Sequence, residues 1–257
     1  MMEMSPYLKT AIRAAKAAEE VIRHYYQGEY EIEIKPDQSP VTIADVETEK
    51  TIRSIILEAF PEHGFFGEET GKLNEDAEYN WLIDPIDGTK SFVRQYPFFS
   101  TQIALMKGDE LIMGVSNAPM FGEMAYAEKG YGAYLNDEPI RVSEIDTLSQ
   151  STLSIGNIAT LAGTDSWLEL GRIIREVNRT RGYGDFYHYH LLASGRIDLV
   201  VESDVNILDI AALSVIINEA GGCFTQLDGG PLTLATTTVL AAANRKLHEV
   251  VLGRLAG

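Results

Sequence analysis

The stretch Trp81-Leu-Ile-Asp84-Pro-Ile-Asp87-Gly-Thr-Lys-Ser-Phe92 decides how the neighbouring parts of the chain must be placed. Its apolar start predicts a short buried strand over 81–83, which should stop at the aspartate and proline that follow. Pro85 has no N–H and biases the preceding residue toward an extended backbone. Gly88 permits a tight turn, after which a helix can begin. The N–H groups of residues 88–90 would then point outward unpaired, which favours binding of a phosphate.

Two carboxylates, Asp84 and Asp87, lie three residues apart beside this predicted anion site. Carboxylates repel phosphate unless cations lie between them, and Mg²⁺, which prefers oxygen ligands, is the simplest such cation. The stretch therefore suggests a phosphate site bridged by metal ions. A plain Asp-Pro/Asp-Gly turn, with Asp87 as the N-cap of the following helix, is the alternative that the residues alone leave open.

The bulk composition restricts the class of protein. With 257 residues and 45% hydrophobic content, the chain can form one large domain or two small ones around a buried core. A net charge of −17 argues against nucleic acid or an anionic membrane as a partner, and it suits a cationic ligand or divalent metals. An acidic surface that serves only solubility is the alternative.

The same composition bears on where the protein works. The single cysteine, Cys223, cannot form an internal disulfide, so we expect a reducing compartment and a buried thiol that acts as a small hydrophobe. The sequence contains no apolar run of transmembrane length and no signal-peptide pattern. We therefore expect a soluble cytoplasmic protein.

Periodicity predicts alternating helices and strands with a strand-rich middle region. The polar segment 144–151 is expected to connect this region, read as one large sheet, to a second region of alternating strands and helices. The expected helices are 6–28, 45–60, 165–178, 187–194, 204–222 and 245–255, and the expected strands are 31–35, 63–67, 81–83, 98–106, 110–116, 122–127, 132–135, 151–156, 199–202 and 239–243.

Three further carboxylates lie at the ends of these predicted elements. Asp45 precedes a helix and is either its N-cap or a carboxylate beside a metal. Glu68 follows strand 63–67, and it could share a cation with Asp84 if the two strands end at the same edge of one sheet. Asp209 lies near the start of a helix that is apolar nearly all round, where a buried carboxylate costs several kcal/mol unless it is paired, capped or bound to a metal.

Taken together, these segments resemble the inositol monophosphatase family of metal-dependent, lithium-sensitive phosphatases over nearly the whole chain. The matching patches are Gly67-Glu68-Glu69, Asp84-Pro-Ile-Asp87-Gly-Thr89, Leu208-Asp209-Ile-Ala-Ala212 and Glu219-Ala-Gly-Gly222. The resemblance implies an α+β fold, a layered αβαβα sandwich that is usually a homodimer. It also implies one phosphatase domain over residues 1–257, with an N-terminal α+β part of about 1–143 and a C-terminal part of about 150–257.

Site roles follow from the resemblance, residue by residue. Glu68, Asp84 and the carbonyl of Ile86 would bind one Mg²⁺, and Asp84, Asp87 and Asp209 a second; a third, weaker ion would involve Glu68. Thr89 and Glu68 would orient the attacking water, Gly88 and Thr89 would hold the phosphate through their N–H groups, and Asp45 would support Thr89. The family usually has tryptophan where this chain has Leu208, so the packing beside the second ion is expected to differ.

The segment after residue 180 indicates which substrate the protein acts on. Arg181-Gly-Tyr-Gly-Asp185-Phe-Tyr and Leu192-Ala-Ser-Gly-Arg196-Ile-Asp198 resemble the histidinol-phosphate phosphatase branch of the family. Asp185 and Glu202 would suit the cationic leaving group of L-histidinol phosphate. Asp185 as the N-cap of helix 187–194 is the alternative.

Two histidines on that helix, His188 and His190, lie two residues apart and so do not share a face, and we interpret them as packing or surface residues. The sequence predicts a Mg²⁺-dependent phosphatase of L-histidinol phosphate, with no nucleic-acid or membrane partner. An inositol-1-phosphate or broad sugar-phosphate phosphatase is the alternative. A non-catalytic regulatory relative is a third possibility, against which the complete carboxylate set argues.

Overall fold

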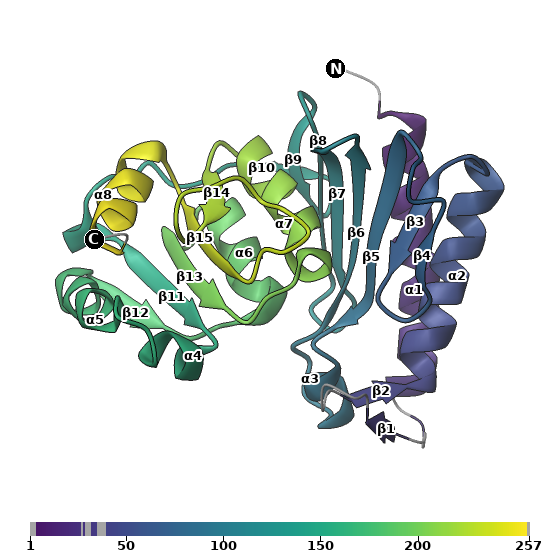
Figure 1. The fold of residues 1–257 in the computed structure, drawn as a ribbon, viewed down its shortest axis with the longest axis horizontal. Helices are drawn as coiled ribbons and strands as arrows, with labels where there is room; N and C mark the ends of the chain where they lie inside the picture. Colours follow the sequence, from purple (N-terminus) through teal and green to yellow (C-terminus); the bar gives the residue numbers. More distant parts are fainter. Residues whose placement is uncertain (1–3, 27, 29–31, 35–39, 256–257) are drawn as a thin grey trace.

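The computed structural model describes residues 4–26, 28, 32–34 and 40–255, which form five alternating layers of helices and sheets (Figure 1). An outer pair of helices packs on an eight-stranded sheet, a middle pair lies between that sheet and a five-stranded one, and further helices cover the far side. The predicted α+β fold, a layered αβαβα sandwich, is confirmed. The helices are α1 (Pro6–Tyr26), α2 (Ile43–Ala59), α3 (Thr89–Val93), α4 (Ile158–Ala162), α5 (Trp167–Glu176), α6 (Asp185–Ala193), α7 (Ile207–Glu219) and α8 (Arg245–Leu255), with a 3₁₀ turn at Leu148–Gln150.

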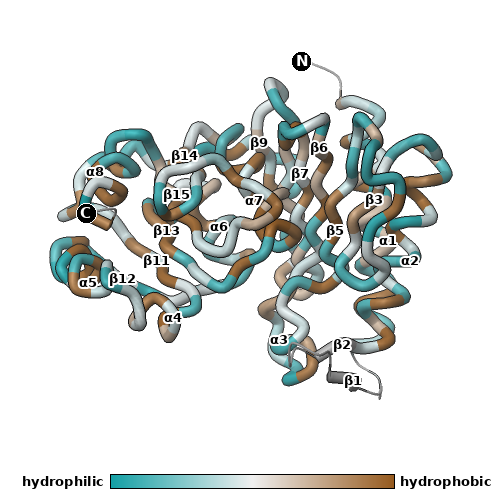
Figure 2. The backbone as a smooth tube through the Cα atoms, viewed as in Figure 1, coloured by the Kyte–Doolittle hydropathy of each residue, from teal (hydrophilic) through white to brown (hydrophobic). Residues whose placement is uncertain are grey.

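The larger sheet has the strand order β10-β9-β8-β7-β6-β5-β3-β4, and all neighbours are antiparallel except β3 and β5. Its strands are β3 (Gly64–Gly67), β4 (Gly71–Leu73), β5 (Tyr79–Asp87), β6 (Ser100–Lys107), β7 (Glu110–Ala118), β8 (Glu123–Glu128), β9 (Gly132–Leu135) and β10 (Glu138–Ile140). Hydrophobic segments follow the strands at the centre of the molecule, whereas the outer loops are mostly hydrophilic (Figure 2).

The smaller sheet has the order β12-β11-β13-β15-β14. Its strands are β11 (Thr152–Gly156), β12 (Arg179–Arg181), β13 (Leu199–Ser203), β14 (Cys223–Gln226) and β15 (Thr238–Ala242). A separate antiparallel pair, β1 (Ile32–Ile34) and β2 (Pro40–Thr42), precedes α2. The expected strand 31–35 corresponds to β1, but its end residues 31 and 35 lie outside the described residues.

Helix α7 is the centre of the packing, as its nearly all-apolar sequence predicts. Ten of its thirteen residues are buried, and it contacts strands of the larger sheet on one side and β14 on the other. Gly114 on β7 lets the two backbones approach closely, since a Cβ there would overlap the backbone of Ala212. Leu208, which stands at the position where the resemblance would place tryptophan, is buried in the core formed around α7. Asp209 in the first turn of α7 is therefore held by a rigid element.

Several element predictions were incomplete. The strands β2, β4, β10, β12 and β14 and the short helix α4 were not predicted, because segments of three to five residues carry too little periodicity. Cys223 is a free thiol at the start of β14 and is half-buried rather than fully buried. Among the described residues, no helix is both long and apolar enough to cross a membrane.

Candidate metal and phosphate site

Two parallel strands bring the first carboxylates together. β3 and β5 run side by side with Gly67 opposite Ile83, so Glu68 and Asp84 follow at the same end of the sheet. The N–H of Glu68 donates to the carbonyl of Ile83 at 3.2 Å, which continues the pairing by one residue. The prediction that these two strands end at a common edge is confirmed.

An irregularity in β5 turns Asp84 and Asp87 toward the same side. Side chains three residues apart on a regular strand point to opposite faces. Here the register with β6 shifts between these two residues, where Pro85 has no N–H to donate to the ladder. The N–H of Ile86 donates to Asp84 Oδ1 at 3.0 Å instead of to a neighbouring strand. The predicted strand end at residue 83 was wrong, since the strand passes through this bulge to Asp87.

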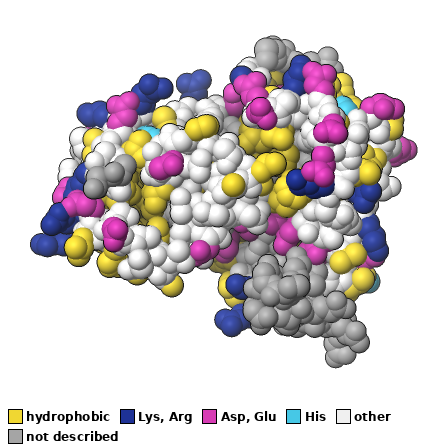
Figure 3. Space-filling model, in the orientation of Figure 1, with side chains coloured by type: hydrophobic (Ala, Val, Ile, Leu, Met, Phe, Trp, Pro, Cys, Tyr) yellow, Lys and Arg dark blue, Asp and Glu magenta, His cyan; other side chains and the backbone are white. Residues whose placement is uncertain are grey.

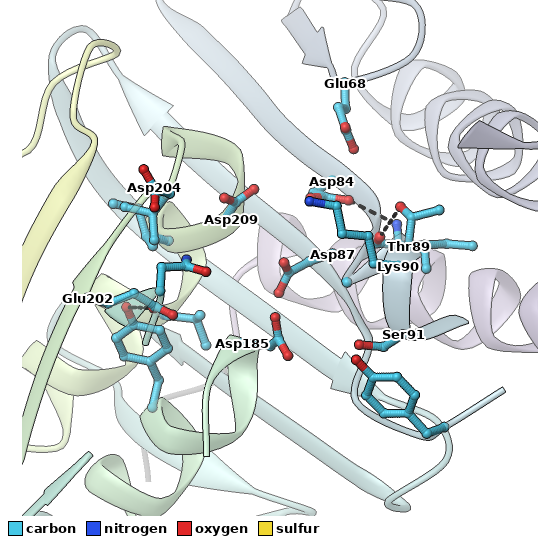
Figure 4. Close-up of a pocket in the computed structure, with 18 residues that line it drawn as sticks. Glu68, Asp84, Asp87, Thr89, Lys90, Ser91, Asp185, Glu202, Asp204 and Asp209 are labelled. Carbon is cyan, nitrogen blue, oxygen red and sulfur yellow. Dashed lines mark hydrogen bonds between the residues drawn. The ribbon is translucent and has the colours of Figure 1, made fainter. Parts of the chain in front are cut away.

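Asp209 reaches the same place from α7. Asn206 is the N-cap of that helix, and its N–H and side-chain amide donate to the Asp209 carboxylate at 2.8 and 2.6 Å. One carboxylate oxygen from each of Asp84, Asp87 and Asp209 lies within 4.8 Å of the other two. Figure 4 shows these three side chains converging from β5 and α7, with Glu68 above them. The Asp209 carboxylate therefore takes part in the capping of α7 and also belongs to the cluster.

The electrostatics of this cluster favour the binding of a positive charge. Burial raises the pKa of Asp84 and of Asp87 well above the usual range, and the neighbouring carboxylates raise both pKa values further. Burial also raises the pKa of Asp209 to about 7, against hydrogen bonding from the Asn206 backbone. Lys90 is the only basic residue among the described residues that line the cavity. Clustered, buried oxygen ligands of this kind fit a hard divalent cation, which would favour their ionised forms.

Of the two predicted alternatives for Asp45, the N-cap of the following helix was wrong. Thr42, not Asp45, is the N-cap of α2, and Asp45 is the third helical residue of a capping box. Its Oδ2 accepts from the N–H and the hydroxyl of Thr42 at 2.8 and 2.7 Å. Its Oδ1 lies 3.1 Å from Thr89 Oγ1, which is also 3.1 Å from the carbonyl of Ile86. Asp45 therefore stabilises the start of α2 and orients Thr89.

The turn after β5 has the form that the sequence predicts for anion binding. Gly88 has a φ of 93°, and a Cβ at this position would come 2.6 Å from the carbonyl oxygen of Phe98. α3 begins directly after it, and Asp87 makes no capping bond, so the plain-turn alternative was wrong on this point. Within the described residues, the N–H groups of Gly88, Thr89 and Lys90 have no hydrogen-bond acceptor. They remain available to an anion.

The cavity extends from this cluster across to the smaller sheet. It measures about 440 Å³, and acidic side chains gather in the hollow where the two halves of the molecule meet (Figure 3). Asp185 at the start of α6, Glu202 on β13 and the following Asp204 line the side opposite α3 (Figure 4). Both halves of the chain therefore contribute to one acidic cavity.

Asp185 does not cap α6, so the capping alternative was wrong: Gly184 is at the N-cap position and Asp185 is the first helical residue. Its φ of 47° lies in the left-handed region, which aspartate adopts more readily than most residues with a side chain. Burial and, next, the charge of Glu202 raise the pKa of Asp185 to about 6, against the lowering effect of His188. The carboxyl group faces Asp87 across the cavity (Figure 4).

The sequence interpretation missed the surroundings of Glu202. His188 is fully buried, not at the surface, and its Nε2 lies 3.0 Å from Glu202 Oε2. Tyr189 donates its hydroxyl to the same oxygen at 2.5 Å. His190 is also buried, but it contacts Ser116 and Glu123 on the larger sheet. The helical spacing correctly separated the two histidines, and only the tertiary structure shows which polar partner each one meets.

Glu49 is a second missed residue. It lies one turn after Asp45 on α2, is fully buried, and accepts from the N–H groups of Glu69 and Thr70 at 2.8 and 2.7 Å. A Cβ at Gly67 would overlap its carboxylate. The spacing of four residues from Asp45 was the available signal, because it places both carboxylates on one face of α2. Glu49 fixes the loop that carries Glu68.

Comparisons with known proteins agree with this geometry. The model of the inositol monophosphatase family matches residues 3–256. A histidinol-phosphatase of Streptomyces coelicolor is 37% identical over 239 residues, covering 87% of this chain and 86% of that protein. A histidinol-phosphatase of Mycobacterium tuberculosis is 35% identical over 254 residues, covering 96% and 97%. The crystal structure of the extragenic suppressor protein suhB from Bartonella henselae superposes with a TM-score of 0.89 at 30% identity, covering 98% of each chain. The chain therefore belongs to the inositol monophosphatase family.

Proposed function

We propose that this protein is a Mg²⁺-dependent phosphatase that hydrolyses L-histidinol phosphate to L-histidinol and phosphate. The observation that carries the substrate assignment is the acidic wall opposite the cluster, formed by Asp185, Glu202 and Asp204. A leaving group that lies between that wall and the cluster is favoured if it is cationic, and histidinol carries an ammonium and an imidazole that can be protonated. The two similar histidinol-phosphatases support the same assignment.

The metal ligands in this proposal are Glu68, Asp84, Asp87, Asp209 and the carbonyl of Ile86. Mg²⁺ ions bound there would activate water, neutralise the phosphate and stabilise the departing alkoxide. The clustering of these carboxylates supports this role, since burial and mutual repulsion raise the pKa values of Asp84, Asp87 and Asp209 and a bound cation would oppose that effect. Rigid elements hold them, since β5 and the first turn of α7 supply three of the four carboxylates.

The chain itself positions the reacting groups. The N–H groups of Gly88 and Thr89 are free to donate to phosphate oxygens at the start of α3. The Thr89 hydroxyl contacts Asp45 and can orient a water for attack on phosphorus, because Asp45 accepts its proton and leaves the oxygen lone pairs toward the cavity. Glu68 lines the same part of the cavity and would contact that water. No covalent nucleophile is required.

At the other end, Asp185 and Glu202 would bind the cationic leaving group. A cation near Asp185 would favour its ionised form, whereas burial and Glu202 raise its pKa in the free protein. Replacing either carboxylate by alanine should therefore raise KM for histidinol phosphate much more than KM for a neutral ester. An equal effect on both esters would contradict the proposed cation pocket.

An inositol-1-phosphate phosphatase is the second candidate, and the family match supports it. Inositol is a neutral polyol and would leave Asp185 and Glu202 without a counter-charge. Phosphate release from both esters in Mg²⁺, measured as kcat/KM, separates the two candidates. Absence of release from either ester would instead point to a non-catalytic relative.

A further inference from the structure

Glu202 is held in one orientation by two buried donors. Its Oε2 receives hydrogen bonds from His188 Nε2 at 3.0 Å and from the Tyr189 hydroxyl at 2.5 Å. Its Oε1 has no hydrogen-bond donor among the described residues, although Glu202 lines the cavity. The carboxylate also fills the space beside Gly156, where a Cβ would overlap it. One oxygen is therefore engaged by the protein and the other is available.

His188 is held on both sides of its ring. Ser154 Oγ accepts the N–H of Tyr183 at 3.2 Å and lies 3.2 Å from His188 Nδ1. A serine hydroxyl can donate one hydrogen bond and accept two, so this contact fixes the ring whether Nδ1 donates or accepts. Nε2 faces the Glu202 carboxylate, which accepts hydrogen bonds, so Nε2 carries a proton that it donates to Glu202.

The two donors fix the carboxylate without occupying its second oxygen. His188 Nε2 and the Tyr189 hydroxyl both contact Oε2, so Oε1 is left for a ligand. His188 does not itself line the cavity. We infer that His188 is a positioning residue for substrate selection, which holds Glu202 in the one orientation that binds a cationic leaving group. This inference rests on the proposed function.

His190 provides a matched control. It is on the same helix, is equally buried, and also contacts a glutamate, since its Nδ1 lies 3.1 Å from Glu123 Oε2. Its other nitrogen lies 2.9 Å from Ser116 Oγ. Neither partner lines the cavity. Loss of His190 therefore reproduces the loss of a buried, hydrogen-bonded histidine without touching Glu202.

The test measures kcat and KM of the Mg²⁺-loaded enzyme for L-histidinol phosphate and inositol-1-phosphate. We expect His188→Leu to raise KM for histidinol phosphate about 10–100-fold, which is the range for one lost hydrogen bond to a charged group. The kcat for histidinol phosphate, and both kcat and KM for inositol-1-phosphate, should change little. His188→Gln, whose amide can donate to Glu202, should restore most of the loss. His190→Leu should leave the ratio of the two kcat/KM values unchanged. Equal changes for both esters in His188→Leu, or the same loss of selectivity in His190→Leu, would overturn the inference.

Two further measurements separate this inference from the proposed function. If Glu202→Gln abolishes the preference for histidinol phosphate while His188→Leu keeps it, the proposed function stands and the inference is overturned. If the wild-type enzyme has no such preference, the proposed function fails. ¹⁵N NMR of the wild-type imidazole nitrogens also tests the donor arrangement without any substrate or variant. A proton on Nε2 is expected, and a bare Nε2 would overturn the inference.

Discussion

The contact between Asp45 and Thr89 gives the sharpest single prediction. Replacing one carboxylate oxygen of Asp45 separates its two roles, which are to cap α2 and to orient Thr89. In Asp45→Asn, the remaining oxygen can still accept both hydrogen bonds from Thr42, so the capping box of α2 survives. The new amide would face Thr89 Oγ1, which must then give its proton to the carbonyl of Ile86, 3.1 Å away. The Thr89 hydroxyl would then no longer have the orientation in which it can bind the attacking water.

The magnitudes follow from these contacts. Loss of a positioned acid–base partner lowers kcat about 10²–10⁴-fold. Burial raises the pKa of Asp45 above its usual value, so a neutral amide removes a desolvation cost. The free energy of unfolding of Asp45→Asn should therefore stay within about 1 kcal/mol of wild type. Asp45→Ala also loses the capping box and should cost about 1–3 kcal/mol, or roughly 2–4 °C in Tm for each kcal/mol.

The assay combines steady-state kinetics with thermal unfolding for Asp45→Asn, Thr89→Ala and the double variant. Because both residues act through one contact, the double variant should be hardly slower than either single variant. Thr89→Ser keeps the hydroxyl and is the matched control, with activity near wild type. Activity of Asp45→Asn within threefold of wild type, or fully multiplicative losses in the double variant, would refute the reasoning.

Three other predictions test the electrostatics and the packing. Without divalent metal, the free energy of unfolding should fall as the pH rises from 3.8 to about 7. The folded-state pKa values of Asp185 (about 6) and Asp209 (about 7) exceed the ordinary aspartate value of 3.8, so the folded protein binds more protons in this range. Differential scanning calorimetry should show this trend and its loss in Mg²⁺, and stability that rises with pH would contradict it. Gly67→Ala should displace the Glu49 carboxylate and raise the Mg²⁺ concentration for half-maximal activity, and an unchanged value would show that Glu49 does not fix the metal-side loop. Gly114→Ala should lower the stability by about 1–3 kcal/mol, measured by urea unfolding, because β7 and α7 must separate; a change below about 0.5 kcal/mol would mean that this contact is loose.

The resemblance to the family predicted the layers and the cluster, and several local features of the sequence agree with it. The apolar α7 could only be a buried helix, and a carboxylate in its first turn required a partner. The parallel arrangement of β3 and β5 places Glu68 beside Asp84, as strand ends in one sheet predict. Pro85 and Gly88 marked the irregular backbone, although the strand continued through the bulge to Asp87.

Contacts between distant segments could not be predicted. Nothing in α6 alone shows that His188 faces Glu202 on β13 while His190 faces Glu123 on β8. Those partners depend on how the helix is rotated between the two sheets. Glu49 is similar, since its backbone partners lie 20 and 21 residues away in a loop without periodicity. Buried polar residues of this kind are satisfied by tertiary structure, which a spacing pattern does not contain.

The most direct test of the account is phosphate release from L-histidinol phosphate and inositol-1-phosphate, measured in parallel in Mg²⁺ as kcat/KM. A cavity with Asp185 and Glu202 opposite the carboxylate cluster predicts a preference of about a hundredfold or more for histidinol phosphate, which is roughly 2.7 kcal/mol of transition-state discrimination. Equal rates, or a preference for inositol-1-phosphate, would contradict the assignment of the acidic wall to a cationic leaving group.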